Sequence, residues 1–310
     1  MRFLLVDRII ELAEGKRASG IKNISWDEDF FEEIFPGIPV FFSIVLAEAA
    51  AQLISWLITA TSNFKVMPLV TMLDSYRCSG HVQPGAQIEM KAYIENLHPE
   101  SALVHGEILF KEKQIIDLNH IVCSLNPLNE LINPDNAKRH FMHIYTDTES
   151  HPPTHFPPLT NHGSREGIPV KKRIWVDRIL NYEESGRIVG VKNVSSTEDC
   201  FNDHFPLKPI LPGVFILESM VSLSRTLVER TLIKNGLNVK KPILKSMQKI
   251  KFRRFVQPGD QLVMDSILEN YDLYKSRVKA KAFVGDKIVA NLSIEFVHLE
   301  REHYLKAYLI

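Results

Sequence analysis

The 310-residue sequence has little cysteine and no excess of charge of either sign. Its 37 Lys and Arg residues balance 37 Asp and Glu residues, so the formal net charge is 0. A general nucleic-acid-binding protein would carry a basic excess, and this balance argues against one. The cysteines, Cys78, Cys123 and Cys200, are widely spaced, with no CxxC or Cys/His metal pattern. We therefore expect reduced thiols, no metal site and a cytoplasmic protein.

The sequence also lacks a convincing membrane segment. Asp7 and Arg8 interrupt the apolar N-terminus, so no signal peptide is expected. Residues 41–60 are mostly apolar, but Glu48 and Gln52 lie near the middle of this stretch, where a carboxylate would be costly in lipid. We predict a buried core helix and no membrane insertion.

The most informative feature that is present is an internal repeat. Residues 34–52 read IFPGIPVFFSIVLAEAAAQ, and residues 204–222 read HFPLKPILPGVFILESMVS. The offset is constant, since 204 minus 34 and 218 minus 48 both give 170. A later VQPG motif, at residues 82–85 and 256–259, recurs at an offset of 174. The length suffices for two domains, so we predict a duplicated module.

Each half is predicted to contain short strands, a Pro-rich loop, one long apolar helix and further β-strands, which is an α+β module. The predicted strands are residues 4–10 and 17–24 in the first half, and 174–180, 187–194, 250–256, 261–269, 276–283 and 287–297 in the second. The helix is apolar nearly all round, so we expect the sheet to wrap around it and bury it.

The sequence divides the chain into four predicted segments. We predict an N-terminal domain at residues 1–126, a linker at 127–169, a C-terminal domain at 170–300 and a tail at 301–310. The linker is rich in Pro, Asn, Thr and His and has no lasting periodicity, which indicates an irregular surface segment. Its histidines are irregularly spaced and favour solvated loop residues over a metal site; they are His140, His143, His151, His155 and His162.

At this point the motifs resemble a known family. VDRII, KNIS, FPGIPV and AEAAAQ in the first half, and VDRIL, KNVS, HFPLKPILPGV and LESM in the second, are similar to the β-hydroxyacyl-acyl-carrier-protein dehydratases of the FabZ/FabA type. The resemblance implies a hotdog fold and a dimer in which each site takes a His from one hotdog and an acidic residue from the helix of the other. In this chain it implies a double hotdog that forms an intrachain pseudo-dimer, with further homo-oligomers also compatible.

Carried over residue by residue, the resemblance implies one working site. His204 and Glu48 would be its catalytic pair, whereas Ile34 and Glu218 would form an inactive pseudo-site because isoleucine cannot take a proton. Gln52 follows Glu48 by one helical turn, where it can orient that carboxylate.

The residues just before the second-half helix extend the same assignment. Pro212 and Gly213 are implied to bind the substrate, with the Gly213 amide directed at the thioester carbonyl. The first half has Phe42 and Ser43 instead. Leu207, which replaces the usual Gly of the family, is a departure beside His204.

The implied reaction is the dehydration of a (3R)-3-hydroxyacyl thioester to a trans-2-enoyl thioester, in fatty acid or polyketide-type biosynthesis. A neutral histidine suits removal of the C2 proton, and a buried carboxyl suits protonation of the leaving hydroxyl. We expect no cofactor. Two alternatives remain open, a hotdog thioesterase and a non-catalytic acyl-binding or scaffold subunit.

The expected partner is an acyl carrier protein with a phosphopantetheine-linked substrate, although a CoA thioester would also fit. Lys249, Lys251 and Arg253 alternate on one face of a predicted strand, with Arg254 opposite. These basic residues could dock an acidic carrier protein, and an ordinary solvated strand face is an equally good interpretation.

Overall fold

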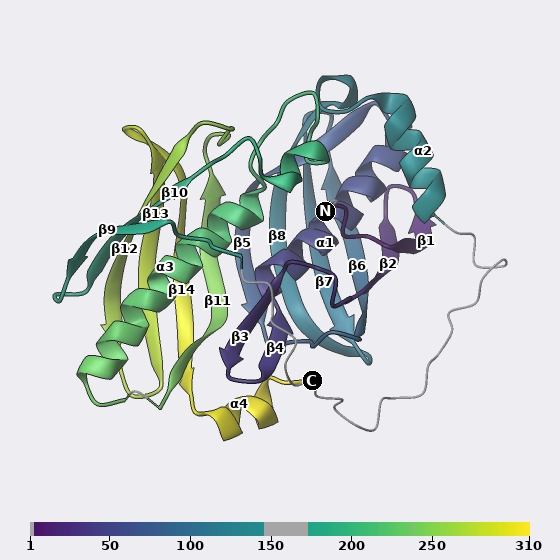
Figure 1. The fold of residues 1–310 in the computed structure, drawn as a ribbon. Coiled ribbons are helices and arrows are strands. Elements are labelled where there is room, and N and C mark those ends of the chain that lie inside the picture. The colour runs from purple at the N-terminus through teal and green to yellow at the C-terminus, as the bar shows by residue number, and fades with distance from the viewer. Residues whose placement is uncertain (1–2, 146–172, 238) are drawn as a thin grey trace.

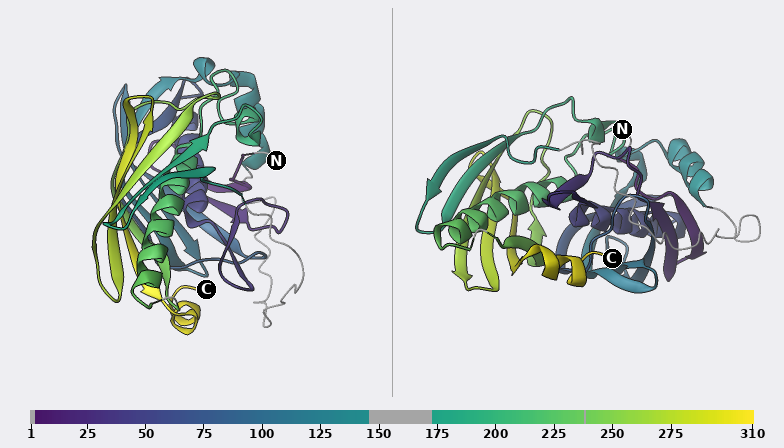
Figure 2. Two further views of the ribbon diagram at one scale, coloured as in Figure 1. Left: turned by 60° about the vertical axis from the view of Figure 1, so that its left-hand side comes forward. Right: turned by 60° about the horizontal axis from the view of Figure 1, so that its bottom comes forward.

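The computed structural model describes residues 3–145, 173–237 and 239–310. Twelve strands form one antiparallel sheet in the order β1-β2-β6-β7-β8-β5-β11-β14-β13-β12-β10-β9. Both long helices, α1 (Ser43–Thr61) and α3 (Gly213–Lys234), lie on the same side of this sheet (Figures 1 and 2). Each strand of the first half has a counterpart in the second half. Both sets follow the same order from their own edge of the sheet to its middle. The structure is the predicted double hotdog.

The sheet strands of the first half are β1 (Arg8–Ala13), β2 (Arg17–Asn23), β5 (Val66–Cys78), β6 (Gln87–Leu97), β7 (Ser101–Phe110) and β8 (Lys113–Pro127). Those of the second half are β9 (Arg178–Glu183), β10 (Arg187–Asn193), β11 (Lys241–Phe252), β12 (Gln261–Tyr271), β13 (Lys275–Val284) and β14 (Lys287–Leu299).

Strands β5 and β11 join the two halves at the middle of the sheet. In this antiparallel pair Tyr76 faces Met247 and Leu73 faces Ile250. These two pairs exchange under the 174-residue offset, since 76 plus 174 is 250 and 73 plus 174 is 247. The seam is therefore self-complementary, as in a two-fold symmetric dimer, although both halves belong to one chain.

The repeated VDR and KN motifs make matching contacts in the two halves. The Asp7 carboxylate accepts a hydrogen bond from the Asn23 backbone N–H at 2.6 Å, and Asp177 accepts one from Asn193 at 2.5 Å. These bonds hold the segment before β1 against the end of β2, and the segment before β9 against the end of β10. The repeated sequence motifs thus specify the same strand connection in both halves.

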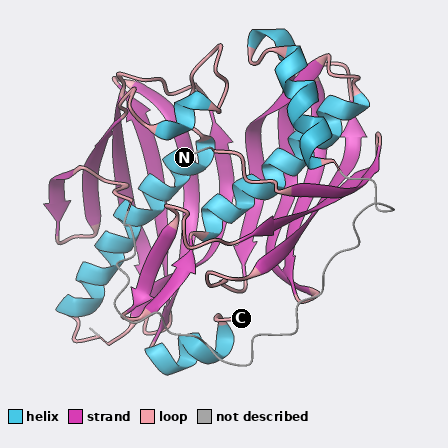
Figure 3. Cartoon of the chain, turned by 45° about the vertical axis from the view of Figure 1, so that its right-hand side comes forward, coloured by secondary structure: helices cyan, strands magenta, loops and turns pink. Residues whose placement is uncertain are grey.

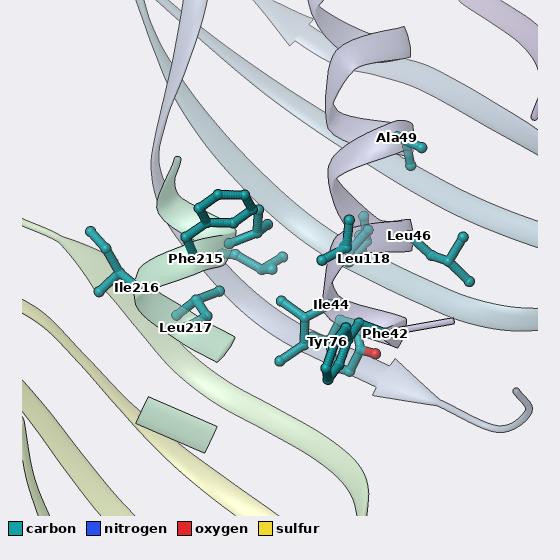
Figure 4. Packing of buried hydrophobic residues seen from close by; sticks show 14 of the residues in the cluster. Phe42, Ile44, Leu46, Ala49, Tyr76, Leu118, Phe215, Ile216 and Leu217 are labelled. Atoms are coloured by element: carbon teal, nitrogen blue, oxygen red, sulfur yellow. The ribbon is translucent and has the colours of Figure 1, made fainter. Parts of the chain in front are cut away.

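Helix α1 is buried over most of its length, because it is apolar on nearly every side. It is the one helix among the described residues that is long and apolar enough to cross a membrane, and 72% of its apolar window is buried inside the structure. Figure 3 shows the two long helices packed against the strands. The first turns of α1 and α3 meet between the halves, where Phe42 and Ile44 lie near Phe215 and Leu217 (Figure 4).

Several predicted strand boundaries are wrong. Strand β11 spans Lys241–Phe252 rather than residues 250–256, because the VQPG motif forms a turn in which Asp260 N–H donates to the Gln257 carbonyl. Strands β1 and β9 begin at Arg8 and Arg178, four residues later than predicted.

The predicted Pro-rich loop takes a different form in each half. In the first half it is a hairpin of β3 (Phe31–Phe35) and β4 (Ile38–Phe41). In the second half it contains a 3-10 turn, η2 (Asp199–Asn202). The two loops already differ in conformation before the shared Phe-Pro, since β3 runs up to Phe35 whereas η2 ends at Asn202, three residues before Phe205.

The predicted linker is not irregular throughout. It contains a 3-10 turn, η1 (Leu128–Glu130), and a helix, α2 (Pro134–Ile144). The Asn133 side chain caps this helix by accepting from two backbone N–H groups, and Pro134 occupies its first turn. Phe141 packs against Trp56 and Phe64, so the helix is held to the core.

His151, His155 and His162 lie outside the described residues. His140, in α2, lies with its ring 5.4 Å from that of Trp56. The predicted tail folds as helix α4 (Arg301–Ala307), which buries Tyr304.

Candidate active site

His204 lies in the loop between η2 and α3. Its Nδ1 is 2.7 Å from the Ile210 carbonyl oxygen, which can only accept a hydrogen bond. In the neutral ring Nδ1 therefore carries the proton, and Nε2 carries the free lone pair. Burial lowers the pKa of His204 to about 4, although the bond to Ile210 opposes the shift. The imidazole is thus neutral near pH 7, with Nε2 available as a base.

Glu48 lies on the second turn of α1, in the other half of the chain. Its Oε1 accepts a hydrogen bond from Gln52 Nε2 at 3.2 Å. Burial raises the pKa of Glu48 to about 7, and the bond from Gln52 opposes this rise. A substantial fraction of this carboxyl group is therefore protonated at neutral pH.

Gln52 connects Glu48 to the N-terminal segment of the chain. Its Oε1 accepts from the Leu5 backbone N–H at 2.8 Å, and its Nε2 donates to the Phe3 carbonyl at 3.1 Å. Leu5 N–H can only donate and Phe3 C=O can only accept, so the Gln52 amide must direct its oxygen at Leu5 and its nitrogen at Phe3. The Gln52 amide therefore presents an N–H to Glu48.

Phe3 was not among the residues predicted for the site. Its N–H donates to Asp203 Oδ2 at 3.1 Å, and its ring centroid is 6.0 Å from that of His204 in an edge-on contact. Phe3 thus contacts the His204 loop of the second half and, through Gln52, the Glu48 helix of the first. We predicted a strand at residues 4–10, but Phe3 lies before β1. Its backbone N–H and C=O bond to the side chains of Asp203 and Gln52.

Gly213 is the first residue of α3, and Pro212 precedes it as the N-cap residue. A Cβ on Gly213 would lie 2.9 Å from the Phe252 ring, so the close approach of this ring requires glycine. N–H groups in the first turn of a helix have no intrahelical acceptor and carry partial positive charge. The Gly213 amide is therefore suited to hydrogen-bond an oxygen that gains negative charge.

The second pair, Ile34 and Glu218, lies in a different environment. Ile34 packs against an apolar cluster that includes Phe35 and Tyr304. Glu218 is 2% exposed, and its Oε1 has no hydrogen-bond partner among the described residues. Burial raises the pKa of Glu218 well above its usual range, and the nearby Glu32 raises it further. Ile34 offers no lone pair, so this pair has no counterpart of the His204 imidazole.

The four predicted docking residues are all exposed, and Lys249 and Lys251 lie in β11 on either side of the buried Ile250. A bulge between Gln248 and Lys251 interrupts β11, and Lys249 adopts a positive φ of 54° there. Arg253 and Arg254 lie beyond the end of β11. The predicted alternation therefore holds in exposure from Lys249 to Arg253, and the docking role stays a prediction.

No group of three His, Cys, Asp or Glu side chains that could hold a metal ion occurs within the described ranges.

Comparison with known proteins identifies the class of protein. The FabA-like domain model matches residues 1–119 and 168–293, which covers most of both halves. The chain belongs to this FabA-like family, as a duplicated, FabZ-like hotdog.

Curated relatives agree with this family. A 3-hydroxyacyl-[acyl-carrier-protein] dehydratase FabZ of Thermoanaerobacter sp. is 33% identical over 143 residues, which is 46% of this chain and 99% of the relative. The FabZ of Hydrogenobaculum sp. is 41% identical over 119 residues, covering 37% of this chain and 77% of the relative. One such relative therefore corresponds to about half of this chain.

Solved structures match the whole double fold. A tesB protein of Mycobacterium avium subs paratuberculosis covers 94% of this chain and 95% of its own, with a TM-score of 0.55 and 10% identity. An acyl-ACP thioesterase from Bacteroides thetaiotaomicron covers 90% of this chain and 97% of its own, with a TM-score of 0.50 and 13% identity. At these identities the likeness concerns the fold alone.

Proposed function

We propose that the chain dehydrates (3R)-3-hydroxyacyl thioesters to trans-2-enoyl thioesters at one composite site formed by His204 and Glu48. The observation that carries this proposal is geometric: Phe3 contacts the His204 ring and accepts a hydrogen bond from the same Gln52 amide nitrogen that donates to Glu48. Burial holds the pKa of His204 at about 4 and that of Glu48 at about 7. Near neutral pH the site therefore offers a neutral base and a carboxyl group that can hold a proton.

In the proposed reaction His204 Nε2 removes the proton at C2 of the substrate. The electron pair of that C–H bond forms the C2–C3 double bond, and the C3–O bond breaks. Glu48 gives its proton to the departing hydroxyl, which leaves as water. The Gly213 N–H donates to the thioester oxygen, which gains charge as C2 loses its proton. Return of the proton from the imidazolium to Glu48 through solvent restores the site.

The first experiment compares His204→Ala and Glu48→Gln with wild type, using a 3-hydroxyacyl thioester of an acyl carrier protein. Each variant should lose roughly 10²–10⁴-fold in kcat, which is the usual contribution of a general acid or base. Glu218→Gln, at the matching position of α3, is the control and should retain activity within about twofold, because Ile34 leaves that pair without a base. The product to follow is the enoyl thioester, by mass spectrometry.

The same reaction mixture separates the alternatives. Accumulation of free acid and thiol without enoyl thioester would indicate a hotdog thioesterase. Equal inactivity of wild type and both variants, with retained binding of the acyl thioester, would indicate a scaffold subunit. Either result would contradict the proposed dehydration.

We propose an acyl carrier protein as the donor of the substrate, in the cytoplasm and in a fatty acid or polyketide-type pathway. The relatives' names support the carrier, and the exposed Lys249, Lys251, Arg253 and Arg254 would meet its acidic surface. Lys251→Glu combined with Arg253→Glu should lower kcat/KM more for the carrier-protein substrate than for a pantetheine thioester. Equal effects on the two substrates would favour CoA thioesters.

A further inference from the structure

The two long helices carry matching positions at the 170-residue offset, but one of these positions carries a charge in only one half. Glu48, Gln52 and Ser55 lie at i, i+4 and i+7 of one helix face in α1. The corresponding residues of α3 are Glu218, Ser222 and Arg225, at the 170-residue offset. A small hydroxyl side chain beside the His204/Glu48 pair is thus replaced by a guanidinium beside the Ile34/Glu218 pair.

Arg225 forms an ion pair that crosses between the halves. Its Nη1 donates to Glu32 Oε2 at 2.5 Å, and the two side chains are only 20% and 13% exposed. Glu32 lies in β3, two residues before Ile34, where the second half has Asn202. We call the surroundings of His204 and Glu48 one half-site and those of Ile34 and Glu218 the other. Both partners of the ion pair are therefore absent from the half-site that contains His204.

The ion pair makes the interior of this half-site polar. Glu32 and Arg225 both act electrostatically on Glu218, so the three ionisable side chains occupy one region. Glu218 Oε1 and Arg225 Nε have no hydrogen-bond partner among the described residues. An alkyl chain placed here would lie against these buried polar groups without offering them a hydrogen bond, which is strongly unfavourable.

The C-terminal segment covers the same half-site from outside. The Tyr304 ring lies 5.4 Å from that of Phe35, and Tyr304 Oη is 2.9 Å from His81 Nδ1. The backbone N–H of His81 donates to the Tyr308 carbonyl at 2.7 Å, and this bond anchors the end of α4. Figure 1 shows α4 beside the β3–β4 hairpin. Phe35 is buried in consequence, whereas its counterpart Phe205 is only half-buried.

We propose that the chain itself closes the Ile34/Glu218 half-site to acyl ligands, with the Arg225–Glu32 ion pair inside and α4 outside. Each chain would then bind one acyl-pantetheine group for its two hotdogs. The identity of the ligand rests on the proposed function, but the closure of the half-site rests on the contacts above.

The test counts binding sites by isothermal titration calorimetry with an unreactive thioether analogue of acyl-pantetheine. Wild type should bind one equivalent, and two equivalents would overturn the proposal. The variant Glu32→Asn/Arg225→Ser/Tyr304→Ala installs the residues of the open half at two positions and removes the cover. It should bind two equivalents while turnover at the other site is unchanged. A folded variant that still binds one equivalent, with folding verified by circular dichroism and thermal melting, would overturn the proposal.

The reciprocal variant Ser55→Arg places the charge in the open half-site. We expect it to lose at least tenfold in affinity for the analogue, and unchanged affinity would contradict the role of the charge.

Binding and turnover separate this inference from the proposed function. His204→Ala should bind one equivalent without activity, so inactivity of wild type would count against dehydration only. If wild type binds no analogue, a gain of one equivalent in the triple variant still supports closure, and no gain overturns it.

Discussion

Gln52 donates a hydrogen bond to the Phe3 carbonyl, 3.1 Å away, with the same amide nitrogen that donates to Glu48 at 3.2 Å. Phe3 in turn contacts the His204 ring, so one short backbone segment lies between the proposed acid and the proposed base. The segment belongs to the first half, and His204 belongs to the second. The geometry of the composite site thus depends on contacts that exist only after the halves have folded together.

Replacement of Gln52 by Leu should move the pH profile and destabilise the fold. The bond from Gln52 lowers the pKa of Glu48, so its loss should raise that pKa and shift the alkaline limb of kcat to higher pH. Leu5 N–H and Phe3 C=O would also lose their partner, at a cost of about 1–3 kcal/mol for each unsatisfied buried group. Urea unfolding and a pH–rate profile measure the two effects.

Ser222→Ala is the matched control for Gln52→Leu, because Ser222 occupies the same position of α3. Its effect on stability should stay within about 0.5 kcal/mol. An unchanged pH profile in Gln52→Leu would show that the amide does not act on the carboxyl group.

The activity should depend on pH through two groups with opposite requirements. Glu48 must be protonated, and its pKa is raised to about 7, so kcat should fall about tenfold per pH unit above that value. His204 must be neutral, and its pKa is lowered to about 4, so the acid limb should lie near pH 4. Glu48→Gln should remove the alkaline limb from the residual activity, and a limb that persists would assign the titration to another group.

The same pKa shifts act on stability in opposite directions. The pKa of Glu48 is higher in the folded state than its ordinary value of 4.5, so its contribution to stability falls as pH rises from about 4.5 to 7. The pKa of His204 is lower than its ordinary value of 6.5, so its contribution rises between about pH 4 and 6.5. The two terms oppose each other, and we expect little net change in unfolding free energy across pH 4.5–6.5.

Gly213→Ala should destabilise the protein through contact with Phe252. The added Cβ would lie 2.9 Å from the ring, so the ring or the start of α3 must shift, at a cost of about 1–3 kcal/mol. The double variant Gly213→Ala/Phe252→Leu should recover part of the loss, because leucine is smaller in the direction of the new methyl group. Additive effects of the two substitutions would place the strain elsewhere.

The duplication and the buried helices could be predicted because they depend on local features of the sequence. The 170-residue offset aligned Glu48 with Glu218, and an all-apolar helix has to be covered. The role of Phe3 could not be predicted, since its contacts join residues about 50 and 200 positions away. The Arg225–Glu32 ion pair was hidden for the same reason, because its partners are 193 residues apart.

Helix α2 was not predicted, although the sequence contains the pattern of a helix there. Asn133 followed by Pro134 is typical of a helix start, and Ala137, Phe141 and Ile144 share one face. The abundance of polar residues around this segment obscured that pattern. A short amphipathic helix with three buried apolar residues is easily mistaken for a linker by composition alone.

Asn133→Ala tests whether α2 contributes to the fold. The Asn133 side chain accepts from the N–H groups of Asp135 and Asn136 at 3.0 and 3.1 Å, so its removal should cost about 1 kcal/mol. Phe141→Ala should cost about 3–5 kcal/mol, because the ring packs between Trp56 and Phe64. Met142→Ala, on the exposed face, should have an effect below about 0.5 kcal/mol. Chemical denaturation of all three gives the ranking, and equal values for Phe141 and Met142 would mean that α2 is not anchored to α1.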